Sequence, residues 1–428
     1  MPGDTLSRLR IALTVFFALD GFVFAGWVVR IPAIKEQTGA SASALGLALL
    51  GVSAGAVVTM MLTGRLCHRY GNHRVTVVCA VLLSLSVTLP PLTHSAPALG
   101  AVLLFFGAAY GGINVAFNSA AVDLVAALDR PVMPTFHAAF SLGGMIGAGL
   151  GGLVADSLSP THHLLGLCVI GLLVTALAGP TLLREAPPGP PGSTPKQASP
   201  HDAASAEDSA GDAAGVAGST PQAPESRKPS TESGTPSSEP LPRRLTPRTR
   251  RLVIVFGLIA LCTAYGEGAL ADWGALHLQQ DLDASPGLAA AGYSCFALAM
   301  TVGRLTGTTL LQRLGRTRTV VAGGTTAAVG MLVASLTPVA WVALLGFAVT
   351  GLGLANIFPV AVERAGALAG PTGVAVASTL GYGGMLLGPP AIGFMADWFS
   401  LPVALTSVAA LAAVAALIGL TIRRASSS

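Results

Sequence analysis

Two carboxylic acids stand inside long apolar stretches of the chain, where their side chains could exchange protons. Asp20 lies seven residues before Trp27, and Glu267 lies six residues before Trp273. Ionisable groups within such stretches are costly, so each is a candidate for a functional role. Burial favours the neutral form of a carboxyl group and lets it take up and release a proton near neutral pH. We therefore expect Asp20 and Glu267 to be proton-coupling residues. The alternative is a structural acid that a helical neighbour or a wet vestibule satisfies.

Polar side chains that could bind a solute also stand in apolar stretches. Asn114 and Asn118 are four residues apart, so both amides lie on one face of a helix, and Asn356 recurs at the matching place of a later stretch. Amides donate to and accept from polar solutes such as sugars, but they also hold helices together. We expect Asn114 and Asn356 to face a substrate cavity, and both roles stay open for Asn118.

Arg304 is the only cation deep inside an apolar stretch. If these apolar stretches cross a membrane, Arg304 lies about 24 Å below the outer surface of that membrane, and Glu267 lies about 10 Å below it. The two side chains are then expected to be too far apart to pair directly. Arg304 could instead bind a carboxylate substrate, pair with a deeper acid, or snorkel to the cytoplasm. His137, near the start of its own stretch, fits a capping or packing role better than a proton relay.

Twelve apolar segments must position these residues. The chain is 52% hydrophobic and 10% charged, with a mean hydropathy of +0.68, whereas soluble proteins carry about 25% charged residues. Segments of about 20 apolar residues cross a bilayer core, and they must be helical to satisfy their own backbone groups. The sequence thus predicts an all-α integral membrane protein with twelve transmembrane helices, at residues 9–29, 43–63, 75–94, 98–124, 133–155, 163–183, 252–275, 287–311, 319–337, 340–362, 373–398 and 401–422.

The sixth and seventh segments are separated by residues 184–251, which contain no Phe, Tyr or Trp and are mostly Ala, Ser, Thr, Gly, Pro, Asp and Glu. Such a composition cannot bury enough apolar surface to fold, so it predicts a disordered linker. The domains are then a six-helix bundle at 1–183, the linker at 184–251 and a second six-helix bundle at 252–428.

The distribution of positive charge predicts the orientation in the membrane. With the N-terminus in the cytoplasm, the outer loops hold only Arg30 and Lys35, and almost all other Lys and Arg residues fall inside. Both termini and the linker are therefore expected in the cytoplasm. The four tryptophans would then lie at the outer interface: Trp27, Trp273, Trp341 and Trp398.

A short loop recurs at the same place in each half, at residues 64–74 and 308–318. Gly71 and Gly315 occupy equivalent positions, where glycine can take the positive φ of a tight turn between helices. The loop resembles the pattern G-x-x-x-D-[RK]-x-G-[RK]-[RK] of the major facilitator superfamily, although His68 and Gln312 stand where that family has Asp. The resemblance implies a cytoplasmic gate motif made of Gly64, Arg65, His68, Arg69, Gly71, Arg313, Gly315 and Arg316.

Three further stretches, at residues 20–27, 130–143 and 388–393, resemble a bacterial branch of this superfamily related to the fucose permeases. Members of the superfamily work by alternating access, in which two bundles rock about a site near the middle of the bilayer. The resemblance also supports a functional role for Asp20, because the fucose permeases carry an important acid on their first helix.

Enzyme classes find no support in the sequence. It has no G-K-[ST] motif of a P-loop ATPase and no H-E-x-x-H motif. Its five cysteines are scattered without a C-x-x-C, so neither a metal site nor a disulfide framework is indicated. A G-x-G-x-x-G match at residues 147–152 lies within an apolar segment, where Gly143, Gly147 and Gly151 instead form a small-residue packing face.

We expect a proton-coupled importer of a sugar-like or other small polar solute in the bacterial inner membrane. The alternatives are a proton-antiporting exporter of a drug or metabolite, and a receptor with the same fold that does not transport. The expected partners are the lipid bilayer, a small solute and protons, with no nucleic acid and no cofactor, and we expect a monomer.

Overall fold

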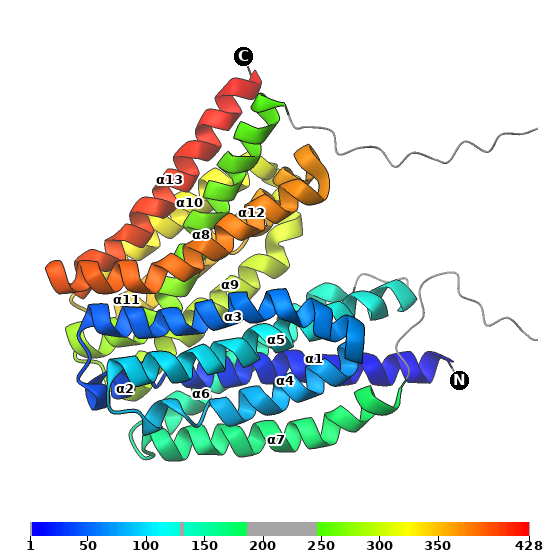
Figure 1. Cartoon of the computed structure of the whole chain (residues 1–428). Helices are drawn as coiled ribbons and strands as arrows, with labels where there is room; N and C mark the ends of the chain where they lie inside the picture. The colour runs from blue at the N-terminus through cyan, green and yellow to red at the C-terminus, as the bar shows by residue number, and fades with distance from the viewer. Residues whose placement is uncertain (1, 129–131, 186–245, 428) are drawn as a thin grey trace, which may run out of the picture. The chain divides into compact units, whose positions relative to one another are not determined.

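The structure is a computed structural model that describes residues 2–128, 132–185 and 246–427 (Figure 1). Helices make up nearly all of these residues, and no strand occurs among them, so the predicted all-α class is confirmed. Eleven helical segments of the described chain are long and apolar enough to cross a membrane. The remaining predicted span, 373–398, is also helical and forms the second part of a longer helix.

The first half contains six long helices and two short elements, α2 (Ile31–Thr38) and the 3-10 turn η1 (Pro90–Leu92). The long helices are α1 (Pro2–Val28), α3 (Ala42–Tyr70), α4 (Asn72–Ser86), α5 (Ala96–Leu128), α6 (Met133–Leu153) and α7 (Pro160–Arg184).

The second half repeats this plan in α8 (Pro247–Asp281), α9 (Pro286–Leu314), α10 (Arg316–Leu336), α11 (Ala340–Leu354), α12 (Ile357–Trp398) and α13 (Leu401–Ser427). The helix α12 joins two predicted spans across a kink at Ala369 and Gly370, where Gly370 has a φ of 58°. The tenth span is therefore α11 with the start of α12, and the eleventh is the rest of α12.

The predicted linker borders need one correction. The helix α8 begins at Pro247, with the Thr246 hydroxyl accepting from the Thr249 backbone N–H, so residues 247–251 are helical. Proline at the first position and threonine as N-cap are common helix-start signals. Most of the predicted linker, residues 186–245, lies outside the described residues.

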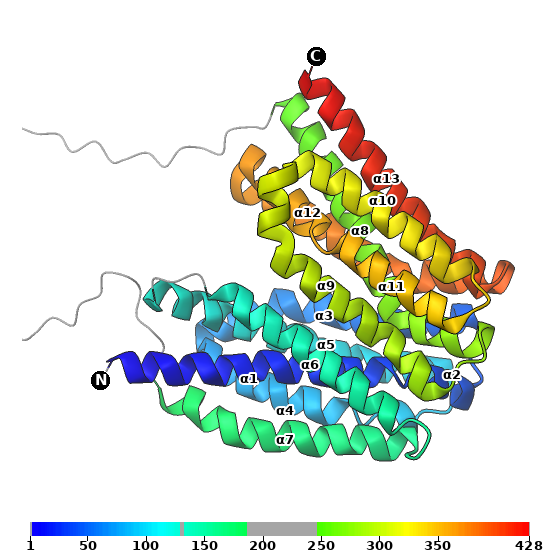
Figure 2. The ribbon, with the colours of Figure 1, turned by 180° about the vertical axis from the view of Figure 1, so that it is seen from behind.

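The helix α6 packs closely on α1, and Figure 2 shows it beside α1 and α9. The backbone carbonyl of Ala18 lies where a Cβ on Gly143 would stand, and the carbonyl of Phe22 lies where a Cβ on Gly147 would stand. A Cβ on Gly151 would instead meet side-chain atoms, of Val29 at 2.5 Å and of His163 at 3.1 Å. The predicted small-residue face is thus confirmed, and it brings α6 against the helix that carries Asp20.

Of the four tryptophans predicted at the outer interface, two are exposed and two are buried inside the protein. Trp341 and Trp398 are 69% and 71% exposed, but Trp27 and Trp273 are 1% and 0% exposed. Trp27 packs against Phe106, with ring centroids 6.3 Å apart. Trp273 is buried because α8 continues past it for eight residues, to Asp281.

The two halves touch at the helix ends that lie opposite the Gly71 and Gly315 turns. At the start of α3, the backbone N–H groups of Ala42 and Ser43 donate to the Asp397 carboxylate at 3.0 and 2.9 Å. Nearby, the Pro389 carbonyl oxygen lies 2.5 Å from where a Cβ on Gly46 would stand. Between α6 and α9, a Cβ on Gly152 would stand 3.1 Å from the Gly287 carbonyl oxygen.

Candidate functional site

A cavity of about 200 Å³ lies where α1, α3 and α5 of the first half face α8 and α12 of the second. Aromatic and apolar side chains make up most of its wall, including Phe24, Trp27, Met60 and Met385. Its polar lining comes from both halves: Ser53, Tyr110, Asn114, Asp272 and Tyr382. A pocket with an apolar wall and a few polar groups is the usual form of a small-molecule site.

Asp20 lies beside this cavity and has no exposed surface. Its Oδ2 accepts a hydrogen bond from Nδ2 of Asn114 at 3.0 Å, while no described residue donates to its buried Oδ1. Neither this hydrogen bond nor the described ion pairs bring a cation to Asp20. Since Asn114 itself lines the cavity, one amide connects the buried acid to the space that a solute could fill.

Asn118 stands on the same face of α5 as Asn114, as the spacing predicts. Its Nδ2 donates to the backbone oxygen of Asn114 at 2.7 Å and lies 3.5 Å from the Asn114 side-chain oxygen. Asn118 is not among the residues that line the cavity. Asn118 therefore contacts Asn114 but does not itself line the cavity.

Glu267 and Arg304 form an ion pair, so the prediction that they lie too far apart is wrong. Nη2 of Arg304 lies 3.3 and 3.4 Å from the two carboxylate oxygens of Glu267. Because α8 extends to Asp281, Glu267 lies about 21 Å along the helix from its C-terminal end, and Arg304 lies about 27 Å from the start of α9. The remaining difference of about 6 Å is within reach of an arginine side chain.

The Glu267–Arg304 pair lines a second, smaller cavity of about 80 Å³ between α6, α8 and α9. Tyr293 lies close to Glu267, Arg304 and also Asp272, so it connects the surroundings of the two cavities. His137 on α6 lies near Arg304 and packs its ring edge-on against Phe17, with centroids 5.6 Å apart. This contact agrees with a packing role for His137.

Asn356 is placed away from both cavities. Its Nδ2 donates to the backbone oxygen of Gly303 at 2.8 Å, and its Oδ1 lies where a Cβ on Gly307 would stand. The amide thus ties the start of α12 to α9 and is 9% exposed. The sequence predicted that Asn356 faces a substrate cavity, but the residue lines neither cavity, and this geometry supports a role in helix-to-helix packing.

Asp272 also belongs to the candidate site, although it was not among the residues predicted from the sequence. It stands one position before Trp273, which was predicted to lie at the outer interface. Nothing in the sequence therefore indicated that the Asp272 carboxyl group lies deep inside a helix bundle. In the structure Asp272 lies nine residues, or about 14 Å, before the end of α8, and it lines the larger cavity. Had Trp273 been read as a core residue, Asp272 would have stood beside Glu267 as a candidate.

Both loop glycines adopt the positive φ that was predicted, 88° at Gly71 and 76° at Gly315. The residue after each glycine contacts an acid of its own half. Nδ2 of Asn72 donates to Asp123 at 2.7 Å, and Nη2 of Arg316 donates to Glu363 at 2.6 Å. In both loops a carboxylate therefore reaches the turn from a neighbouring helix, although the loop itself has His68 and Gln312 where the family pattern has Asp.

The other side chains of the predicted gate motif are exposed: Arg65, His68, Arg69 and Arg313. The Arg69 guanidinium lies 5.4 Å from the centroid of the Tyr70 ring, and a Cβ on Gly64 would meet nothing within 4 Å. These residues lie at the turn side of the helices, away from the contacts at Asp397.

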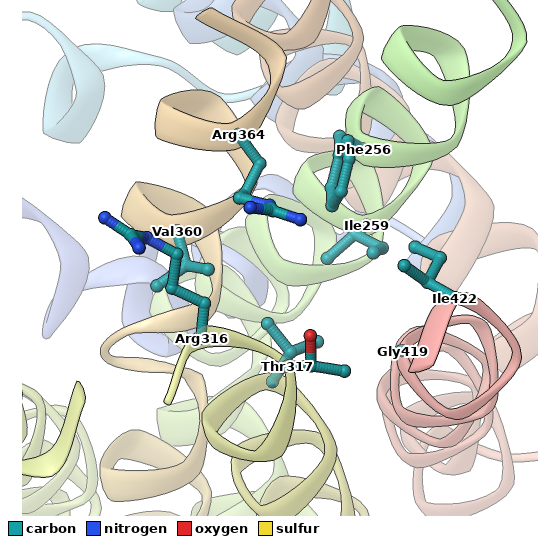
Figure 3. Close-up of a pocket in the computed structure, with 9 residues that line it drawn as sticks. Phe256, Ile259, Arg316, Thr317, Val360, Arg364, Gly419 and Ile422 are labelled. Carbon is teal, nitrogen blue, oxygen red and sulfur yellow. The ribbon is translucent and has the colours of Figure 1, made fainter. Parts of the chain in front are cut away.

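Two other hollows do not fit a transported solute. Figure 3 shows one between α8, α10, α12 and α13, where Arg364 lies 5.8 Å from the centroid of the Phe256 ring. Its volume of about 10 Å³ is close to the minimum for a single water. The other is a largely apolar groove of about 540 Å³ on α3, α4 and α5, formed by the first half alone. Among the described residues, no three His, Cys, Asp or Glu side chains gather to hold a metal.

The fold and the central cavity are those of a membrane carrier built from two related six-helix halves. The family model of the Major Facilitator Superfamily matches residues 11–266 and 256–428, so the chain belongs to that superfamily. This confirms the family and the twelve-helix fold class predicted from the loops, whereas the branch related to the fucose permeases stays a prediction.

Relatives and solved structures agree with this assignment. The chain is 31% identical to an uncharacterised MFS-type transporter of Yersinia pestis, over 94% of this chain and 92% of the relative. It is 26% identical to the membrane protein MosC of Rhizobium meliloti, over 97% and 90%. A bacterial homologue of the human lysosomal transporter Spinster, in an inward-facing and unoccupied conformation, shares the fold with a TM-score of 0.71, 14% identity and coverage of 98% and 97%. The nucleoside transporter NupG shares it with a TM-score of 0.67, 13% identity and coverage of 96% and 98%.

Proposed function

We propose that this transporter couples the movement of a small polar solute to the movement of protons, with Asp20 as the proton-carrying group. The observation that carries the proposal is the buried Asp20 carboxyl, which lies beside a cavity made by both halves and has one amide hydrogen bond and no cation partner among the described residues. An ionised carboxylate in that setting would be costly, so the carboxyl holds a proton while it is closed off from water.

Asn114 gives this proton a way to influence the solute. Its amide donates to Asp20 and also lines the cavity, so it responds to the charge of Asp20 on one side and to a solute on the other. When the site opens to water, Asp20 can ionise, and the amide then donates to a full negative charge. The proton and the solute are thereby linked through one side chain, as a coupled carrier requires.

Uptake of a sugar-like or other small polar solute is the direction that we propose first. Export of an amphipathic drug or metabolite is a second candidate, because the cavity wall is mainly aromatic and apolar. Uptake and efflux of one solute panel in bacterial cells, with and without a proton gradient, separate the two. Uptake that stops when the gradient is collapsed supports import. Efflux that stops supports export, and movement of no solute in either direction favours a receptor.

We further propose that the Gly71 and Gly315 turns and both termini face the cytoplasm of a bacterial inner membrane, and that the carrier acts as a monomer. The scarcity of cations on the other side supports this orientation. Glu36 on α2 and Gln312 at the end of α9 are both exposed and suit a test. A membrane-impermeant maleimide added to intact cells should label Glu36→Cys and leave Gln312→Cys unlabelled. The unaltered chain measures background, and the reverse pattern would invert the topology.

The Asp397 contact should help to keep the carrier closed on its outer side. It accepts from two N–H groups at the start of α3, where the helix dipole favours a negative charge. Contacts of this kind are worth about 0.5–2 kcal/mol, so Asp397→Ala should raise outward opening about two- to thirtyfold. The measurement is labelling of the cavity residue Ser53, as Ser53→Cys, by an impermeant reagent from outside.

Asp283→Asn is the matched control for the Asp397 variant. Asp283 is an exposed acid in the loop between α8 and α9 and makes no such bond among the described contacts. Its loss should leave the labelling rate unchanged. If Asp397→Ala also labels at the rate of the parent, the contact does not contribute to the outer closure.

A further inference from the structure

Asp272 is the only charged side chain among the described residues that line the larger cavity. The neighbouring charges are already compensated, because Glu267 and Arg304 pair with each other. No hydrogen bond or ion pair to Asp272 is found within the described parts of the chain. The Asp272 carboxyl group therefore has no partner in the described part of the chain and lines the space where a solute would bind.

The wall of the same cavity is rich in aromatic rings. Phe24 and Trp27 come from α1, Tyr110 from α5 and Tyr382 from α12. Phe24 and Tyr110 stack with their ring centroids 5.0 Å apart. The faces of such rings attract cations and pack against apolar bodies, and they offer no charge to an anion.

We propose that this cavity binds a small organic cation, with its ammonium group at the Asp272 carboxylate and its body against the aromatic rings. Asn114 offers an amide hydrogen bond to a polar group on the same solute. The volume of about 200 Å³ has room for about seven waters, and so for a solute of roughly that many non-hydrogen atoms or slightly more. The proposal rests on the proposed function in one respect, that the cavity is the solute site.

Three shape-matched ligands test the proposal on the purified full-length chain: 2-phenylethylamine, 2-phenylethanol and phenylacetate. Binding is measured by the fluorescence of tryptophan, since Trp27 lines the cavity, and independently by the shift in thermal unfolding. A charged hydrogen bond predicts that the amine binds about tenfold to hundredfold more tightly than the alcohol, with the carboxylate weakest. Equal binding of all three, or no binding of the amine, overturns the proposal.

Variants locate the preference within the cavity. Asp272→Asn should reduce the preference for the amine over the alcohol to nearly none, and Asp272→Glu should keep it. Asp283→Asn makes the same change of charge at an exposed loop position and should leave the preference intact. An Asp272→Asn protein that still prefers the amine contradicts the assignment. Should that variant fail to fold, the ligand series on the unaltered chain still decides the charge preference.

The binding assay needs neither a membrane nor a gradient, which separates this proposal from the proposed function. A chain that prefers the amine but moves no solute with protons keeps the cation site and loses the transport mechanism. A chain that couples protons to the movement of neutral solutes and shows no preference for the amine keeps the mechanism and loses the cation site.

Discussion

Replacing Asp20 by Asn is expected to abolish gradient-driven movement of solute while leaving the chain folded. The amide oxygen of Asn can accept the same hydrogen bond from Asn114 that Asp20 Oδ2 accepts now. It cannot release a proton, so accumulation should fall to simple equilibration across the membrane. Because a neutral group replaces a buried acid of the same size, the free energy of unfolding should change by about 1 kcal/mol or less.

Asp4→Asn is the control on the same helix. Asp4 is an exposed acid paired with Arg8 at the start of α1, where a lost ion pair is worth little. This variant should accumulate solute like the parent. Glu267→Gln tests the other acid, whose partner Arg304 would then stand unpaired. If Asp20→Asn and Glu267→Gln both stay fully gradient-driven, neither acid couples protons to the solute.

Replacing Gly143 by Val should prevent most protein molecules from folding. A Cβ at this position would overlap the backbone carbonyl of Ala18, and backbone cannot move aside as a flexible side chain can. The helices α1 and α6 would have to separate, at a cost of about 3 kcal/mol or more. The yield of monodisperse protein after extraction from membranes measures the effect.

Gly149 offers a matched control on the same helix. A Cβ there would meet nothing within 4 Å, so Gly149→Val adds the same isopropyl group to α6 without touching α1. Its yield should stay close to that of the parent. Equal losses from both variants would show that the helix tolerates valine poorly at any position, and the close contact between α1 and α6 would not be the cause.

The sequence was sufficient for features that depend on local pattern. Apolar segments of spanning length predict the helices, and spacing alone predicts that Gly143 and Gly147 share a packing face. The positive φ of Gly71 and Gly315 also followed from a short repeated loop. These features are determined by a few neighbouring residues, so no knowledge of the rest of the fold was needed.

Depth in the membrane was harder to predict, because it depends on where a helix ends. Trp273 was predicted to lie near the outer end of its helix, whereas α8 continues to Asp281. That single error separated Glu267 from Arg304 and concealed Asp272. The role of Asn356 was missed for a related reason, since its bond to Gly303 joins two helices whose register no local pattern reveals.

The most direct test of the coupling mechanism is proton movement in proteoliposomes that contain only the purified chain. A pH-sensitive dye in the lumen reports protons while an outward or inward gradient of the best-binding solute is imposed. The unaltered protein should move protons with the solute, and Asp20→Asn should move solute without them. Solute flux through the unaltered protein with no change in lumenal pH would contradict proton coupling, as would proton movement by Asp20→Asn equal to that of the parent.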